Sequence, residues 1–170
     1  GSMSRIVLSI LVDNTAGVLS RVAGLFSRRG YSIDSLTVGE TQESGISRMT
    51  VVASGDNQIL EQIGKQLSKL EDVREIKELK QGGSVCRELV LVKVHVEEAD
   101  RQSVIAIADI FRAKIVDVAK DSLMVELTGN QAKIDAFIKL LDDFGILEMV
   151  RTGATGLERG SGDIADYIDD

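Results

Sequence analysis

The sequence predicts an α+β fold made of two consecutive ferredoxin-like βαββαβ units, each an antiparallel sheet that carries its helices on one face. Two observations predict it: apolar residues change from strand spacing to helix spacing along the chain, and the same order of elements occurs twice. A glycine-rich stretch separates the two copies. The predicted organisation is a first domain at 3–80, a linker at 81–86, a second domain at 87–152 and a Gly-rich acidic tail at 153–170.

In the first copy, an apolar strand at 6–12 precedes a helix with one apolar face. That face consists of Val18, Leu19, Val22, Leu25 and Phe26, and the stretch 28–30, two arginines and a glycine, ends the helix. Strands are expected at 32–38 and 46–54, with a hairpin between them. A second helix begins at 54–56 and presents Ile59, Ile63, Leu67 and Leu70, and a fourth strand follows at 73–79.

In the second copy, a strand at 87–96 places Val90, Val92, Val94 and Val96 on one face. A helix near 101–112 and two strands at 114–119 and 123–128 follow. Asn130 is expected to cap a helix containing Ile134, Phe137, Ile138 and Leu141, and the last strand lies at 145–151.

One sheet face in the second copy is expected to lack helices. Leu89 and Leu91 alternate with the valines and therefore point to that face. An apolar face on a small unit is commonly covered by a partner, so we expect a homodimer. A monomer with half of this strand face exposed is the alternative.

Composition excludes several classes of protein. The 170 residues are 44% apolar and 28% charged, which is ordinary for a soluble globular protein. No apolar run approaches a membrane span, and no signal-peptide pattern is present, so a cytoplasmic protein is expected. The net charge of −7 disfavours a nucleic-acid partner. With one cysteine (Cys86) and one histidine (His95), no nucleophile–base pair or metal cluster can be assembled.

The stretch from Asp13 to Val22 is the most informative part of the chain. The first strand breaks at Asp13 and Asn14, turns through Ala16 and Gly17, and enters a helix whose first backbone N–H groups have no partner within the helix. Such donors, together with the positive end of the helix dipole, suit a carboxylate without a charged side chain. On the spacing alone, Asn14 is better explained as a turn or cap residue, and Gly17 as a backbone requirement.

Several motifs together resemble one family, the small regulatory subunit of acetohydroxyacid synthase, also called acetolactate synthase. They are NTAGVLSRV at 14–22, GLFSRRGY at 24–31, IDSLTV at 33–38, SRMT at 47–50, LEQIGKQL at 60–67, RELVLVK at 87–93, IFRA at 110–113, IVDV at 115–118 and GLERG at 156–160. The resemblance spans nearly the whole chain, in order and with matching spacing. It implies that the first domain is an ACT domain, a ferredoxin-like module that binds amino acids.

The resemblance also implies a chain without catalytic residues, metal or cofactor of its own. In the family, the subunit activates a separate catalytic large subunit that uses thiamine diphosphate, Mg²⁺ and FAD, and it confers feedback inhibition by valine or other branched-chain amino acids. Two ACT domains pair edge to edge, with the effector at their junction. An ACT-type sensor that controls another enzyme or regulator is the alternative function.

Carried over by position, the effector-binding residues are Asn14, Thr15, Ala16, Gly17, Val18, Ser32 and Ile33. By this resemblance, the Asn14 amide contacts the effector, and a β-carbon at Gly17 would occupy the place of its carboxylate. Two positions depart from the family. Ala16 stands where proline is frequent, and Ser32 stands where asparagine usually reaches across the dimer. The glycines and aspartates after Thr152 match neither a phosphate loop nor a calcium loop, so a flexible tail is expected there.

Overall fold

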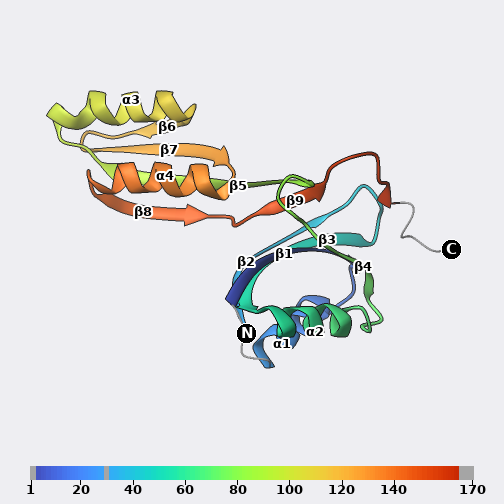
Figure 1. The fold of residues 1–170 in the computed structure, drawn as a ribbon. Helices are drawn as coiled ribbons and strands as arrows, with labels where there is room; N and C mark the ends of the chain where they lie inside the picture. Colours follow the sequence, from blue (N-terminus) through green and yellow to red (C-terminus); the bar gives the residue numbers. More distant parts are fainter. Residues whose placement is uncertain (1–2, 29–30, 165–170) are drawn as a thin grey trace. The chain divides into compact units, whose positions relative to one another are not determined.

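The computed structural model describes residues 3–28 and 31–164, and the chain forms two compact units. The first unit comprises the chain up to Val85 together with the residues from Gly153 onward, and the second is Cys86–Thr152. Each unit has the predicted βαββαβ order, with an antiparallel sheet and both helices on one face (Figure 1).

The first unit is a four-stranded sheet in the order β2-β3-β1-β4. Its elements are β1 (Met3–Asp13), α1 (Val18–Arg28), β2 (Ser32–Glu40), β3 (Ile46–Asp56), α2 (Asn57–Leu67) and β4 (Val73–Glu78). The core lies between the sheet and the two helices. It includes Ile10 and Val12 from β1, Val22 and Phe26 from α1, and Ile63 from α2, all at most 2% exposed.

The start of α2 differs slightly from expectation. Strand β3 continues through the stretch expected to begin the helix, and Asp56 is the N-cap. Its carboxylate accepts a hydrogen bond from the Gln58 amide at 2.9 Å, which satisfies one of the free donors of the first turn. The expected end of α1 at 28–30 is described only to Arg28, because residues 29 and 30 lie outside the described residues.

The second unit repeats the arrangement in the order β6-β7-β5-β8. Its elements are β5 (Ser84–His95), the short 3₁₀ helix η1 (Glu98–Asp100), α3 (Arg101–Phe111), β6 (Lys114–Val118), β7 (Ser122–Gly129), α4 (Gln131–Asp142) and β8 (Ile146–Arg151). Asn130 caps α4, as predicted, by accepting a hydrogen bond from the Lys133 amide at 2.9 Å. Strand β5 begins at Ser84, inside the stretch expected to be a linker.

The two faces of β5 behave as the alternation predicts. Val90, Val92, Val94 and Val96 are buried, whereas Leu89 and Leu91 on the opposite face are half-buried. On that face, Leu91 lies with Met124 and Val150 around the ion pair between Lys93 Nζ and Glu148 Oε2 (2.7 Å). The homodimer expected to cover this face stays a prediction.

The C-terminal segment (residues 153–164) differs from the expected flexible tail, because it packs on the first unit. It contains β9 (Thr155–Glu158), which pairs with β5, whose first residues belong to this unit. The Thr37 hydroxyl donates to the Ala154 carbonyl at 3.3 Å, and Ile164 packs with Leu11 and Ile46 in a buried cluster. Leu11 alternates with the core residues Ile10 and Val12, so the segment covers the sheet face opposite the helices. The acidic end from residue 165 lies outside the described residues.

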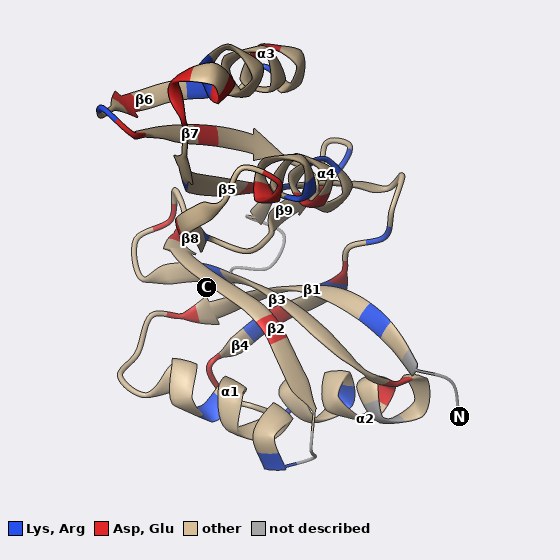
Figure 2. Cartoon of the chain, turned by 90° about the vertical axis from the view of Figure 1, so that its left-hand side faces the viewer, with Lys and Arg blue, Asp and Glu red and all other residues tan. Residues whose placement is uncertain are grey.

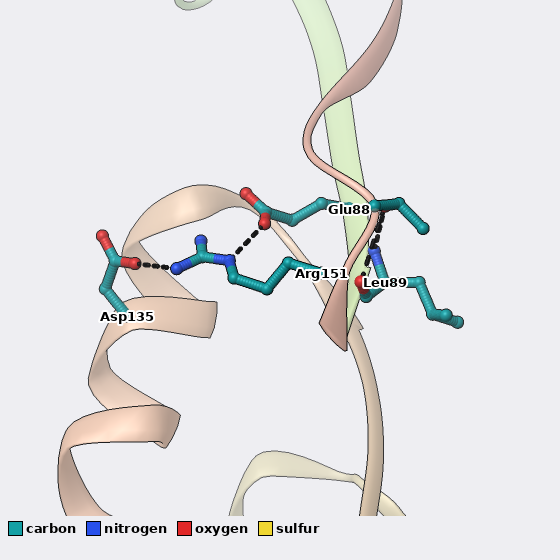
Figure 3. Close-up of polar contacts among 5 residues, drawn as sticks. Glu88, Leu89, Asp135 and Arg151 are labelled. Carbon is teal, nitrogen blue, oxygen red and sulfur yellow. Dashed lines mark hydrogen bonds and ion pairs between the residues drawn. The ribbon is translucent and has the colours of Figure 1, made fainter. Parts of the chain in front are cut away.

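A buried carboxylate in the second unit is held by an ion pair between strands. The Glu88 side chain is 5% exposed, and its Oε1 lies 2.8 Å from Nε of Arg151 (Figure 3). Arg151 Nη1 also lies 2.9 Å from Oδ1 of Asp135 on α4. The Glu88 carboxylate, by its hydrogen bond, is the main cause that raises the pKa of Arg151. The three side chains tie β5, β8 and α4 together at one end of the sheet.

We predict that Arg151→Ala lowers the free energy of unfolding by about 3 kcal/mol, because it leaves Glu88 buried without its ion-pair partner. Asp135→Asn is the matched control, since it removes the more exposed pair and is expected to change stability by less than about 1 kcal/mol. Urea unfolding of the full chain measures both. Equal effects of the two substitutions would contradict a special role for the buried pair.

We also predict that Ile164→Ala destabilises the chain by about 2 kcal/mol, because it empties the buried cluster under the C-terminal segment. Leu157→Ala in the same segment is the control. Leu157 is 57% exposed, so this change should stay within about 0.5 kcal/mol. Thermal unfolding measures the difference, and a neutral Ile164→Ala would show that the segment is not anchored on the sheet.

Candidate functional site

The loop between β1 and α1 has a fixed backbone conformation. The Asn14 amide donates to the Gly45 carbonyl at 2.8 Å, and the Thr15 amide donates to the Asp13 carbonyl at 2.8 Å. Gly17 has a φ of +82°, in the left-handed region that favours glycine. Val18 follows at once and is buried in the core, so the helix begins from a fixed point.

This conformation leaves several donors open at the start of α1. Within residues 3–28 and 31–164, the N–H groups of Ala16, Gly17, Leu19 and Ser20 meet no acceptor. The first turn of α1 carries no acidic side chain to fill that role. Open amides at the positive end of a helix dipole can hold a carboxylate or another small anion. The geometry expected from the sequence is therefore present.

A side-chain clamp that the sequence did not predict holds this loop from one side. Nε of Arg21 lies 3.0 Å from Oδ2 of Asp72, and Nη2 of Arg21 contacts the same oxygen. The Thr15 hydroxyl donates to Oδ1 of Asp72 at 2.9 Å. The hydrogen bond from Thr15 first, and the Arg21 guanidinium second, lower the pKa of the Asp72 carboxyl. Nη2 of Arg21 also donates to the Ala16 carbonyl at 3.3 Å. These contacts hold the loop backbone, and we call the group of Thr15, Arg21 and Asp72 the loop clamp.

Gly17 lies directly against this clamp. A β-carbon added at Gly17 would lie 3.0 Å from Nη1 of Arg21. A contact that short requires the guanidinium to move by a few tenths of an ångström, against its hydrogen bonds to Asp72. The structure therefore gives a second reason for glycine at this position, beside the φ angle and the room for a ligand expected from the sequence.

Asn14 is exposed, and its side-chain amide has no hydrogen-bond partner among the residues that the structure describes. The capping bond that would explain Asn14 in purely structural terms is thus absent from this part of the chain. Ala16 is also exposed, beside the open amides. Both residues are therefore open to solvent, and the contact of Asn14 with an effector stays a prediction.

Ser32 and Ile33 lie at the other end of the same sheet. Ser32 pairs with Ser54, and Ser54 pairs with Arg5 near the start of β1, whereas the loop follows Asp13 at the end of β1. From Arg5 to Asp13 the strand rises about 27 Å, at about 3.4 Å per residue. One chain therefore does not bring the two halves of the expected site together, and a site containing both requires a second copy of the chain.

A cavity of the first unit lies elsewhere. It measures about 70 Å³ and is lined by residues of β1, β3, β4 and the C-terminal segment, among them Ser9, Arg48, Leu157 and Ile164. The loop residues do not line it. They do not line a second hollow of this unit either, which lies along α2 and β4.

Among the described residues, no group of three or more His, Cys, Asp or Glu side chains could hold a metal ion. Cys86 and His95 lie near opposite ends of β5, and Nε2 of His95 lies 2.9 Å from Oε1 of Glu97. That hydrogen bond is the main cause that raises the pKa of His95.

No helix in the described part of the chain is long and apolar enough to cross a membrane. Acidic and basic residues are interspersed along the ribbon (Figure 2).

Two residues near the loop were missed from the sequence. Arg21 lies one helical turn after Gly17, so its position beside the loop could have been inferred from helix spacing. Asp72 lies in the turn between α2 and β4, and no local pattern connects it with the loop. Only the antiparallel pairing of β4 with β1 brings Asp72 next to the loop.

Comparisons with known proteins agree with the fold. A family model described as the ACT domain of the acetohydroxyacid synthase small subunit matches residues 8–75, and one described as the small subunit of acetolactate synthase matches 87–160. The probable acetolactate synthase small subunit of Methanothermobacter thermautotrophicus is 53% identical over 156 residues, covering 91% of this chain and 93% of that protein. The acetolactate synthase small subunit of Mycobacterium leprae is 48% identical over 153 residues, covering 90% of each.

The structural comparison gives the same result. The crystal structure of the acetolactate synthase small subunit from Thermotoga maritima superposes with a TM-score of 0.84 and 38% identity, covering 94% of this chain and 99% of that one. Identity of this extent, over nearly the full length of both chains, establishes the family. The chain belongs to the acetolactate synthase small subunits, and its first unit is an ACT-like domain.

Proposed function

We propose that this chain activates the catalytic subunit of acetolactate synthase and makes it sensitive to feedback inhibition by valine or a related branched-chain amino acid. The observation that carries the proposal is the set of open amides at the start of α1, next to the exposed Asn14. They match the needs of a free amino acid, whose carboxylate accepts hydrogen bonds. The small subunits to which this chain is similar support the choice of enzyme.

The effector-binding residues in this proposal are Asn14 to Val18 of one chain with Ser32 and Ile33 of a second. The open amides of the loop hold the carboxylate, and the Asn14 amide contacts the polar end of the amino acid. The separation of the two groups within one sheet supports a homodimer through the ACT domains. Serine at position 32 is shorter than asparagine and offers different donors, so it adjusts the cross-dimer contact.

The catalytic chemistry in this proposal belongs entirely to the partner. The catalytic large subunit carries thiamine diphosphate, Mg²⁺ and FAD, and this chain acts in the cytoplasm by changing how that subunit works. Effector binding inhibits only if the effector has different affinities for the active and inactive states of the complex. A coupling of about 1–3 kcal/mol changes affinity or activity about 5- to 150-fold.

The alternative function is an amino-acid sensor that controls a different enzyme or regulator. Capture of native partners by the tagged full chain separates the two. Recovery of a thiamine-diphosphate enzyme supports the proposal, whereas consistent recovery of another enzyme without it supports the alternative.

We predict that Gly17→Asp abolishes valine inhibition of the reconstituted enzyme while leaving activation unchanged. The substitution places a negative charge where the effector carboxylate would lie, and aspartate tolerates a positive φ better than most residues. Acetolactate formation with and without valine, at saturating regulatory chain, measures both effects.

Gly64→Asp on α2 is the control, because it adds the same charge where no neighbour lies within 4 Å of the new β-carbon. It should keep the valine response. Undiminished inhibition of the Gly17→Asp enzyme would contradict the assigned site. An enzyme with wild-type chains that ignores saturating valine, leucine and isoleucine would contradict feedback control itself.

A further inference from the structure

We propose that Arg21 is a positioning residue of the effector site, and that its contact with Gly17 adds to the requirement for glycine that the positive φ already sets. This inference rests on the proposed function, since it concerns the same loop. It adds a residue outside the predicted set and assigns Gly17 a role that differs from making room for the ligand. Three features of the contacts around the loop support this inference: the orientation of the loop peptides, the charge of the guanidinium and its contact with Gly17.

The first feature is the orientation of the loop peptides. Nη2 of Arg21 donates to the Ala16 carbonyl at 3.3 Å, which turns that carbonyl toward the guanidinium. In a planar peptide, the N–H of Gly17 then points the opposite way. The bond from Arg21 thereby fixes the direction in which the Gly17 amide is offered to a ligand.

The second feature is charge. Both contacts of Arg21 with Asp72 go to Oδ2, while Oδ1 accepts the Thr15 hydroxyl. The guanidinium is therefore paired with a carboxylate, and its charge is largely neutralised before any effector arrives. A cation held in this way acts as a clamp on the loop rather than as the group that binds an incoming carboxylate.

The third feature is the contact with Gly17. The guanidinium lies over the glycine so closely that a β-carbon would meet Nη1 at 3.0 Å. Alanine at this position would push the guanidinium away by a few tenths of an ångström, which lengthens the bond of 3.3 Å from Nη2 to the Ala16 carbonyl. Gly17→Ala and loss of Arg21 should thus damage the same interaction. If glycine were needed only for its φ angle or for ligand room, the two changes would act independently.

The experiment is a double-mutant cycle of Gly17→Ala and Arg21→Gln, read as the dissociation constant of valine by calorimetry on the full regulatory chain. Each single substitution should weaken binding about tenfold, and the double substitution should weaken it by about thirtyfold, because the φ cost of alanine adds to the loss of Arg21 whereas the contact with the guanidinium is lost only once. Losses that multiply to about a hundredfold would overturn the inference. Arg21→Lys keeps the charge without the planar fork, so it should behave like the glutamine variant, and full rescue by lysine would also overturn the inference.

Arg74→Gln is the matched control. Arg74 pairs with Asp13 at 2.8 Å, at the same end of the sheet, and among the described residues its hydrogen bonds and ion pairs do not include Ala16 or Gly17. It should leave the valine dissociation constant within about twofold. A loss equal to that of Arg21→Gln would mean that general charge loss, and not the clamp, explains the effect.

A second measurement needs no effector. Nuclear magnetic resonance of the unliganded chain should show the Ala16 amide signal shifted in the same direction by Gly17→Ala and Arg21→Gln, at an unchanged unfolding midpoint for Arg21→Gln. An unshifted Ala16 amide signal in Arg21→Gln would overturn the inference. Failure of the wild-type chain to bind branched-chain amino acids would count against the proposed function alone, because the amide signal still decides the role of the clamp.

Discussion

The antiparallel register of β1 on β3 is the constraint on which the candidate site depends. It sets Asp13 opposite Ile46 and Arg5 opposite Ser54, and the pairing of β2 with β3 then carries Ser32 to the end of the sheet away from the loop. A shift by one residue would exchange the two sheet faces, moving Ile10 and Val12 out of the core. The burial of those side chains therefore fixes the register. The register in turn fixes which site residues one chain can bring together.

The same sheet also explains why the open amides of the loop do not find acceptors within the loop itself. The loop is held from both sides by elements remote in sequence: the Asn14 amide is bonded to the Gly45 carbonyl of the hairpin, and Thr15 and Arg21 are bonded to Asp72 before β4. Local preference alone would let the backbone turn so that its donors find internal acceptors. Distant contacts remove that freedom. Preorganised donors lower the ordering cost of binding, which is the usual physical advantage of a rigid site.

The sequence predicted those features that depend on local patterns. Helix and strand periods gave the twofold βαββαβ order, Asn130 was recognised as a cap, and the alternation at Val90 to Val96 identified the buried face of β5. It did not predict features that depend on long-range pairing. The glycines after Thr152 suggested a flexible tail, yet Ala154 and Ile164 pack on the sheet, because glycine-rich composition describes local freedom and not tertiary burial. Asp72 was missed for the same reason, since nothing near it in the sequence points to the loop.

The proposed sharing of the effector site between two chains would have a thermodynamic consequence. In a dimer with twofold symmetry, a loop from one chain that meets the start of β2 from the other occurs twice, so each dimer holds two equivalent sites. A ligand that contacts both chains binds the dimer more tightly than the separated chains, and mass action then makes effector binding and dimerisation reinforce each other. Under this arrangement the loop clamp contributes to assembly as well as to recognition. An amide held in the correct direction favours the ligand, and the bound ligand favours the paired chains.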